Sequence, residues 1–298
     1  MSEILFACMP ANAQQALVLI RSLRTFGGSL AQSPIWLMVP RGEQLFSHDD
    51  QAALTPQGVL VVPCDVDADA RQFPFAAKVF AAALVESLAQ TYQIKHLIWL
   101  DSDVLFIQEP GDLLIPAEKH LGYCPVHHRL IGSRIDKPLD AFWSLVYETC
   151  AVPPDHVFSM RTIVGDEAIR PYINAGFMAT KPADGLLQAW CDQFAALFLD
   201  ERFTAFYEQH VLYRIFVHQA ILTGVVMAKF APADLIELPR RYNYPLHLYA
   251  DHAPEKRPPS INDLITCRYE NVFAEAGWPD RFPITGDLKT WLENQFRG

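Results

Sequence analysis

Two aspartates stand one residue apart inside an apolar segment. Asp101 and Asp103 interrupt the run LIWLDSDVLFI, and the apolar pattern resumes directly after them. In an extended chain, residues two apart point to the same side, and two adjacent carboxylates repel unless a positive group neutralises them. Carboxylate oxygens are the ligands that Mg²⁺ and Mn²⁺ prefer. The pattern therefore predicts a divalent metal, Mn or Mg, on Asp101 and Asp103.

Other interpretations of this motif stay open. The strand could end at Leu100 and leave two solvated aspartates in a turn. An apolar strand followed by D-x-D is also typical of haloacid-dehalogenase-like phosphatases, in which the first aspartate, here Asp101, is the nucleophile. That motif normally opens the chain, whereas a long α/β segment precedes it here, and Gly165-Asp166-Glu167 matches the later acidic pair only in part. A nucleotidyltransferase is disfavoured because MPANAQQ lacks a phosphate-binding glycine.

A second polar motif is Asn174-Ala175-Gly176. The asparagine supplies both a donor and an acceptor to hydroxyl groups, and the two small residues after it let a ligand approach the backbone closely. A tight bend would use the same residues, so binding and bending are equally favoured by the residues alone.

The elements that position these motifs alternate in the first half of the chain. Apolar runs predict strands at Glu3–Met9, Pro34–Val39, Val59–Val62 and His96–Ile107. Helical periodicity predicts a helix capped by Asn12 and a second helix over Phe75–Gln90, with Phe75 on its apolar face. This alternation predicts an α/β fold with a mostly parallel central sheet flanked by helices. Ligands bind beyond the carboxyl ends of such strands.

The second half is less regular, and no linker or repeat divides the chain. Strands are predicted at Leu121–Val126 and Tyr172–Thr180, and helices at Leu139–Cys150, Gly185–Leu199 and Val211–Lys229. We therefore expect one domain over residues 1–298.

Composition excludes several partners. The chain has 24 basic and 34 acidic residues, a net charge of −10, whereas nucleic-acid binding needs clustered Lys and Arg. Its six cysteines form no C-x-x-C pair and predict reduced core thiols. The first apolar run lacks the basic residues of a signal peptide, and no membrane-spanning stretch is expected. We expect a cytoplasmic protein with no nucleic-acid partner and no transmembrane segment.

The order and spacing of these motifs resemble a known family. Asp101-Ser102-Asp103, the YINAG segment Tyr172–Gly176 and His218-Gln219 follow one another as in the A-type glycosyltransferases. The chain is most similar to the family of glycogenin and the bacterial lipopolysaccharide galactosyltransferases, from Ile4 to about Trp278. The resemblance implies the nucleotide-diphospho-sugar transferase fold, with a nucleotide-binding half (1–107) and an acceptor and sugar half (108–298).

The resemblance also implies a reaction and its partners. In that family the two aspartates hold manganese, which grips the diphosphate of a sugar nucleotide. We therefore expect a nucleoside-diphosphate sugar donor, with a UDP-sugar favoured, and a carbohydrate acceptor. Asn174 matches the segment that lines the sugar pocket, and Gln219 matches the residue beside the reacting carbon, so both are expected to be catalytic. Expected nucleotide-sugar contacts are Ala7, Asn12, Lys78, Asp101, Ser102, Ala175, Gly176, His218 and Arg268.

The chain departs from the family pattern at two important positions. His218 replaces an aspartate, and Arg268, before the matching Tyr269, replaces the histidine that is the third metal ligand. Glu270 is then the first choice for the third ligand and His247 the second. Arg268 could instead contact the diphosphate directly, because a guanidinium matches phosphate geometry. A sugar-nucleotide-binding relative without turnover stays open as an alternative, as does the phosphatase.

Overall fold

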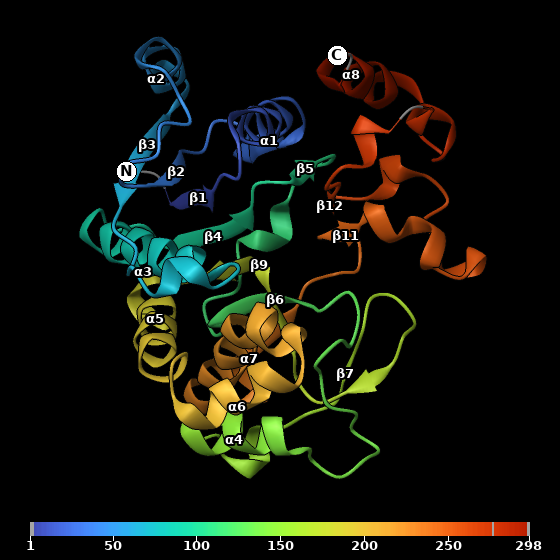
Figure 1. Cartoon of the computed structure of the whole chain (residues 1–298). Coiled ribbons are helices and arrows are strands. Elements are labelled where there is room, and N and C mark those ends of the chain that lie inside the picture. Colours follow the sequence, from blue (N-terminus) through green and yellow to red (C-terminus); the bar gives the residue numbers. More distant parts are fainter. Residues whose placement is uncertain (1–2, 276, 297–298) are drawn as a thin grey trace.

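The computed structural model describes residues 3–275 and 277–296. Within these residues, helices surround one large sheet (Figure 1). In this part of the chain the sheet has seven strands in the order β10-β6-β9-β4-β1-β2-β3. Their bounds are β1 Ile4–Met9, β2 Ile35–Pro40, β3 Val59–Cys64, β4 His96–Asp101, β6 Leu121–Pro125, β9 Ile173–Thr180 and β10 Leu235–Glu237. Only β9 runs antiparallel to its neighbours, β4 and β6. The predicted α/β fold with a mostly parallel sheet is confirmed.

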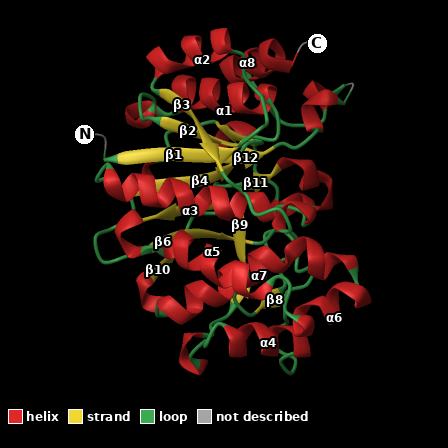
Figure 2. Ribbon diagram, turned by 60° about the vertical axis from the view of Figure 1, so that its left-hand side comes forward, coloured by secondary structure: helices red, strands yellow, loops and turns green. Residues whose placement is uncertain are grey.

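Helices cover both faces of this sheet. Leu5 and Ala7 of β1 pack into one core with α3, α5 and α7, whereas Phe6 and Cys8 pack into another with α1. Figure 2 shows α3 in front of the central sheet, running along the direction of β1 and β4. The helix bounds are α1 Ala13–Phe26, α2 His48–Leu54, α3 Ala76–Thr91, α4 Ala141–Thr149, α5 Leu186–Leu197, α6 Glu201–Gln209, α7 Val211–Lys229 and α8 Gly286–Phe296.

The last part of the chain builds a third core beside α1. Strands β5 (Val104–Phe106), β12 (Thr266–Arg268) and β11 (Tyr244–Pro245) form a separate sheet, and β5 and β12 run antiparallel. The final helix α8 lies near α1, where Arg21 donates to Gln295 at 3.0 Å and the rings of Phe26 and Trp291 meet edge to face. A two-stranded sheet joins β7 (Met160–Arg161) and β8 (Ala168–Ile169).

Two predicted elements need correction. The strand predicted over His96–Ile107 is two strands, because Ser102 and Asp103 form a turn that carries the chain from the large sheet to the small one. Helix α3 begins at Ala76 rather than Phe75. Phe75 instead adopts a left-handed backbone conformation with φ of 61° and is 49% exposed.

Two further expectations concern the cysteines and the longest helix. The six cysteines are buried and free, as predicted. Within the described residues, α7 is long and apolar enough by length and composition to cross a membrane, which by itself is weak evidence for a span. Moreover, 61% of its 18-residue window is buried inside the protein, where it packs on β9 and α5. The functional division into residues 1–107 and 108–298 stays a prediction.

Candidate active site

The two aspartates lie where the two sheets meet. Asp101 is the last residue of β4, level with Met9 at the end of the parallel neighbour β1. Asp103 follows in the turn that leads into β5. The carboxyl ends of two adjacent parallel strands therefore present these groups at the sheet edge where ligands bind in α/β proteins.

Two cations hold these carboxylates. Lys78, in the first turn of α3, places its Nζ 2.5 Å from Oδ1 of Asp101. Arg268, the last residue of β12, donates through Nε and Nη2 to both oxygens of Asp103 at 3.0–3.2 Å. Its Nη1 lies 3.5 Å from Oδ2 of Asp101. One guanidinium thus touches both aspartates.

Burial makes this network strong. The side-chain exposures of Lys78, Asp101, Asp103 and Arg268 are 10%, 17%, 8% and 20%. Burial alone would raise the pKa of Asp101, but Lys78 and Arg268 outweigh it and lower that pKa to about 2. Burial would lower the pKa of Arg268, but the two aspartates raise it above its usual value. Asp101 and Arg268 therefore stay charged at neutral pH.

The Asn-Ala-Gly segment lies beside Asp101 on the antiparallel strand β9. A Cβ on Gly176 would lie 2.1 Å from Oδ2 of Asp101, so only glycine leaves room for that carboxylate. Asn174 accepts a hydrogen bond from the Gly176 amide through Oδ1 at 2.8 Å. The motif therefore shapes the backbone around Asp101 as well as offering an amide to a ligand.

Helix α7 supplies two residues to the same place. Gln219 accepts a hydrogen bond from the Ala175 amide through Oε1 at 3.0 Å. His218 lies with its ring 5.6 Å from that of Phe75. Burial, followed by the charge of Lys78, lowers the pKa of His218 to about 3, so the imidazole is neutral at physiological pH.

The turn residue Ser102 ties this edge to α1. Its hydroxyl accepts from the Ala11 amide at 3.1 Å and donates to Oε1 of Gln15 at 2.8 Å. Asn12 caps α1 by accepting from the Gln15 amide at 2.9 Å. These bonds fix the head of α1 against the aspartate turn.

Three cavities adjoin one another along this edge. One of about 280 Å³ is lined by Lys78, Asp101, Asp103 and Arg268 together with Gln15. A smaller one of about 50 Å³ adds Asn174, Gly176, His218 and Gln219 and shares Lys78, Asp101 and Arg268 with the first. The sequence-predicted residues from distant parts of the chain thus meet at one site.

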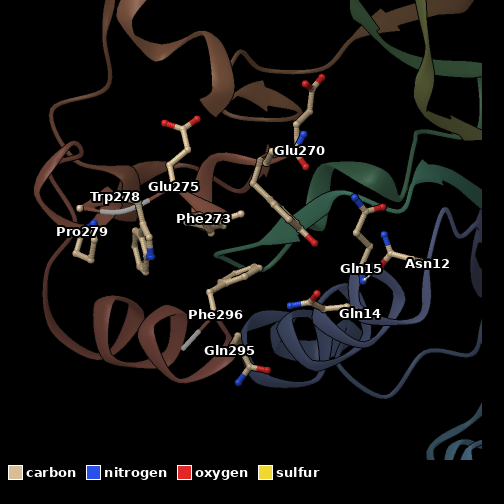
Figure 3. Close-up of a pocket in the computed structure, with 14 residues that line it drawn as sticks. Asn12, Gln14, Gln15, Glu270, Phe273, Glu275, Trp278, Pro279, Gln295 and Phe296 are labelled. Atoms are coloured by element: carbon tan, nitrogen blue, oxygen red, sulfur yellow. Dashed lines mark hydrogen bonds between the residues drawn. The ribbon is translucent and has the colours of Figure 1, made fainter. Parts of the chain in front are cut away.

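The third and largest cavity, of about 620 Å³, lies between α1 and the C-terminal segment. Figure 3 shows Asn12, Gln14 and Gln15 on one side of it and Phe273, Trp278 and Phe296 on the other. Gln15 lines this cavity and the one around the aspartates, so the two are neighbours. Among the lining residues that the structure describes, amides, carboxylates and aromatic rings occur but no Lys or Arg.

The expected metal ligands do not form a metal site in this arrangement. Oε1 of Glu270 lies 3.7 Å from Nη2 of Arg268 and 3.3 Å from Nε2 of His247. Within residues 3–275 and 277–296, no three His, Cys, Asp or Glu side chains form a group that could hold a metal ion. The two aspartates pair with two cationic side chains, an arrangement that does not fit a divalent ion.

Two further residues differ from the sequence analysis. Ala7 lies in the middle of β1 and is only 1% exposed, so it packs in the core; Met9 and Ala11, nearer the strand end, line the cavity instead. Phe75 was expected on the apolar face of a helix, yet it lines both small cavities with Lys78 above its ring. An aromatic residue with positive φ is strained, and nothing in the sequence marked it.

Comparison with known proteins decides the family. The profile of the Rhodobacterales glycosyltransferase domain matches residues 7–229. The chain belongs to this family. The comparison with curated proteins gave no match. The family assignment shows that this Rhodobacterales-type glycosyltransferase is an enzyme that transfers sugars, and the resemblance to glycosyltransferases expected from the motifs is confirmed.

Solved structures agree on the fold. An active-site mutant of LgtC is 16% identical with a TM-score of 0.53, covering 98% of this chain and 94% of that one. The galactosyltransferase LgtC in complex with donor and acceptor sugar analogs is 16% identical with a TM-score of 0.51, covering 99% and 96%. Mouse xyloside xylosyltransferase 1 is 16% identical with a TM-score of 0.48, covering 90% and 97%. The two LgtC structures show that the fold is that of A-type glycosyltransferases.

The phosphatase alternative was therefore wrong. The phosphatase would also need its later acidic residue, here Asp166, beside Asp101. Asp166 instead bonds to Arg240 and Lys256 and does not line a cavity with Asp101.

Proposed function

We propose that the protein transfers a sugar from a nucleoside-diphosphate sugar, with a UDP-sugar favoured, to a carbohydrate acceptor. The observation that carries this proposal is the contact of Lys78 and Arg268 with Asp101 and Asp103 beside the cavity that Asn174 and Gln219 line. Two cations suit a diphosphate, and two amides suit sugar hydroxyls.

The adjoining cavities suggest an order for the donor. The diphosphate lies at Lys78 and Arg268, its sugar extends toward Gln219, and its nucleoside extends past Gln15 into the cavity of Figure 3. The aromatic and amide lining there suits a neutral base and ribose better than a phosphate. The sugar end holds only about 50 Å³, room for water rather than a sugar ring, so Phe75 or Phe216 moves when the donor binds.

The chemistry follows from the charges. The bond between the anomeric carbon and the diphosphate oxygen breaks, and its electron pair stays on the diphosphate. The acceptor hydroxyl oxygen bonds to the anomeric carbon and gives its proton to the departing diphosphate. Lys78 and Arg268 stabilise the negative charge that grows on the leaving group, in a site that excludes much of the water. The Gln219 amide does not titrate, so it orients the acceptor or the sugar rather than acting as a base.

Other parts of the expected function stay predictions. These are the preference for UDP and the cytoplasmic location, whereas the expected metal role of Asp101, Asp103 and Glu270 is not part of the proposal. The proposal is tested by incubating the protein with a panel of UDP-, GDP-, CDP- and dTDP-sugars and a panel of mono- and disaccharide acceptors. Acceptor-dependent release of the nucleoside diphosphate, with a glycosylated product by mass spectrometry, supports it. Phosphate ester hydrolysis without sugar transfer contradicts it.

A further inference from the structure

We propose that Arg268 and Lys78 take the place of a divalent ion, so that this glycosyltransferase binds and uses its nucleotide sugar without a divalent metal. The inference rests on the proposed function, because it concerns the diphosphate of the same donor.

The first support is the charge balance of the site. Asp101 and Asp103 contribute two negative charges, and Lys78 and Arg268 contribute two positive charges in direct contact with them. A divalent ion needs the same carboxylate oxygens. It would either add two positive charges beside aspartates that already have cationic partners, or separate a cation that is at least 80% buried from its aspartate, which is costly inside a protein.

The second support is the way in which the backbone fixes Arg268. Strand β12 pairs with β5 so that Arg268 lies opposite Val104, the residue after Asp103. The amide of the next residue, Tyr269, donates to the carbonyl oxygen of Asp103 at 3.1 Å. The guanidinium is therefore held against Asp103 by main-chain pairing on both sides, unlike a surface arginine that can swing away.

The third support is the unused capacity of Arg268. A guanidinium has five N–H donors in a rigid fork. The hydrogen bonds to Asp103 use Nε and Nη2, whereas Nη1 makes only a 3.5 Å ion pair with Asp101. Arg268 also lines both small cavities. It can therefore keep its carboxylate partners and donate to a diphosphate, as a metal ion with open coordination positions would.

The fourth support concerns the remaining candidate ligand. Glu270, at the rim, faces Arg268 and His247 rather than joining the two aspartates. In the described part of the chain, no cluster of three His, Cys, Asp or Glu replaces it. The site thus offers a metal two carboxylates that already have cationic partners.

The experiment measures binding of UDP, GDP, CDP and dTDP to the protein by isothermal titration calorimetry. Each is titrated into protein treated with EDTA and into protein with added MnCl₂. We expect at least one of the four to bind in EDTA, with an affinity that Mn²⁺ changes by less than about tenfold. Sugar transfer, where a donor is found, should likewise persist in EDTA.

The outcomes separate this inference from the proposed function. Binding that appears only with Mn²⁺, or strengthens far more than about tenfold, overturns the inference and leaves the proposed function standing. No binding of any nucleoside diphosphate under either condition overturns both.

A variant tests the residue itself. Arg268→His exchanges the guanidinium for a neutral metal ligand, which leaves the two aspartates short of one positive charge. We expect this variant to bind the nucleoside diphosphate at least tenfold more weakly in EDTA and to recover with Mn²⁺.

Arg134→Met is the matched control, since Arg134 makes a bidentate pair with Asp136 at the surface. Equal binding by Arg268→His and the native protein in EDTA contradicts the role of Arg268. If the variant does not fold, the EDTA titration of the native protein still decides.

Discussion

Gly176 and Asp101 are packed so closely that a methyl group on the glycine would lie 2.1 Å from a carboxylate oxygen of the aspartate. Because β9 runs beside β4, this contact is set by backbone pairing and cannot relax without moving Asp101. Gly176→Ala should therefore destabilise the protein by about 1–3 kcal/mol and weaken nucleoside-diphosphate binding. Thermal unfolding and calorimetry measure the two effects.

Gly111→Ala is the control for that substitution. A methyl group on Gly111 would meet no heavy atom within 4 Å, and the φ of this residue is not positive, so stability and binding should stay native. Native binding by Gly176→Ala would show that the close contact does not position Asp101.

Lys78→Met should make sugar transfer sensitive to acid. Lys78 is the first of the charges that lower the pKa of Asp101 to about 2, against the effect of burial. Stability from this depressed pKa is present above the unfolded value of 3.8 and is lost as the pH falls through about 2. Without Lys78 the carboxylate protonates at higher pH, and the protein loses about 3 kcal/mol, the usual cost of breaking a largely buried pair.

The measurement is nucleoside-diphosphate release between about pH 4 and pH 7. The native profile should be set by groups other than Asp101, whereas Lys78→Met should lose activity at the acid end. Lys95→Met, which removes an exposed pair with Glu3, serves as the control and should follow the native profile. If Lys78→Met and Lys95→Met lose activity to the same extent at acid pH, the pairing of Lys78 with Asp101 does not set the pKa of Asp101.

Gln219→Ala should lower turnover more than donor affinity. The substitution removes the amide from the sugar end of the site and leaves the Ala175 amide without its acceptor. An unpaired buried N–H costs about 1–3 kcal/mol of stability. Gln219→Glu keeps an acceptor for that amide, so it should recover the stability without recovering turnover. Steady-state kinetics and urea unfolding give the two readouts, and a variant with weakened affinity but native turnover would contradict the expectation.

Glu86 should give the protein a pH-dependent stability outside the active site. Its side chain is buried and accepts hydrogen bonds from the amides of Leu187 and Gln188 at the start of α5. Burial raises its pKa from 4.5 to about 7, although those amides oppose the shift. The folded protein thus retains a proton that the unfolded chain releases, so this contribution is full below pH 4.5 and is lost as the pH rises through about 7.

Urea unfolding at about pH 5 and pH 7.5 tests this contribution. The free energy of unfolding should fall with rising pH by up to about 3 kcal/mol in the native protein and by much less in Glu86→Gln, which cannot titrate. Exposed Glu118→Gln is the control and should keep the native dependence. Equal slopes in all three proteins would remove Glu86 as the cause.

Much of the fold could be predicted from local pattern. Apolar runs and helical periods located β1, β2, β9 and α7 closely, because each buries a continuous apolar face. The division of one predicted strand into β4 and β5 could not be predicted, because both halves are apolar and only the change of sheet separates them. The left-handed Phe75 was also invisible, since tertiary contacts rather than residue type impose its conformation.

Many residues of the site could be predicted from the sequence, but the contacts between their side chains could not. The motifs correctly brought Asp101, Asn174 and Gln219 to one cavity. The sequence could not show that Arg268 reaches the aspartates, because that contact depends on the antiparallel pairing of β12 with β5 across more than half of the chain. The D-x-D motif indicated that the two carboxylates need a positive partner, which was expected to be a metal ion rather than Lys78 and Arg268.

The late position of β12 has a consequence for how the protein is made. Ribosomes release the N-terminal part of a chain first, and elements fold as they emerge. Asp101, Asp103 and Lys78 leave the ribosome long before Arg268, so the nascent sheet holds two clustered carboxylates with one countercharge until Thr266–Arg268 pairs with β5. The active site is thus completed only near the end of synthesis, and a chain terminated before residue 266 would carry most of the sheet but an unneutralised donor site.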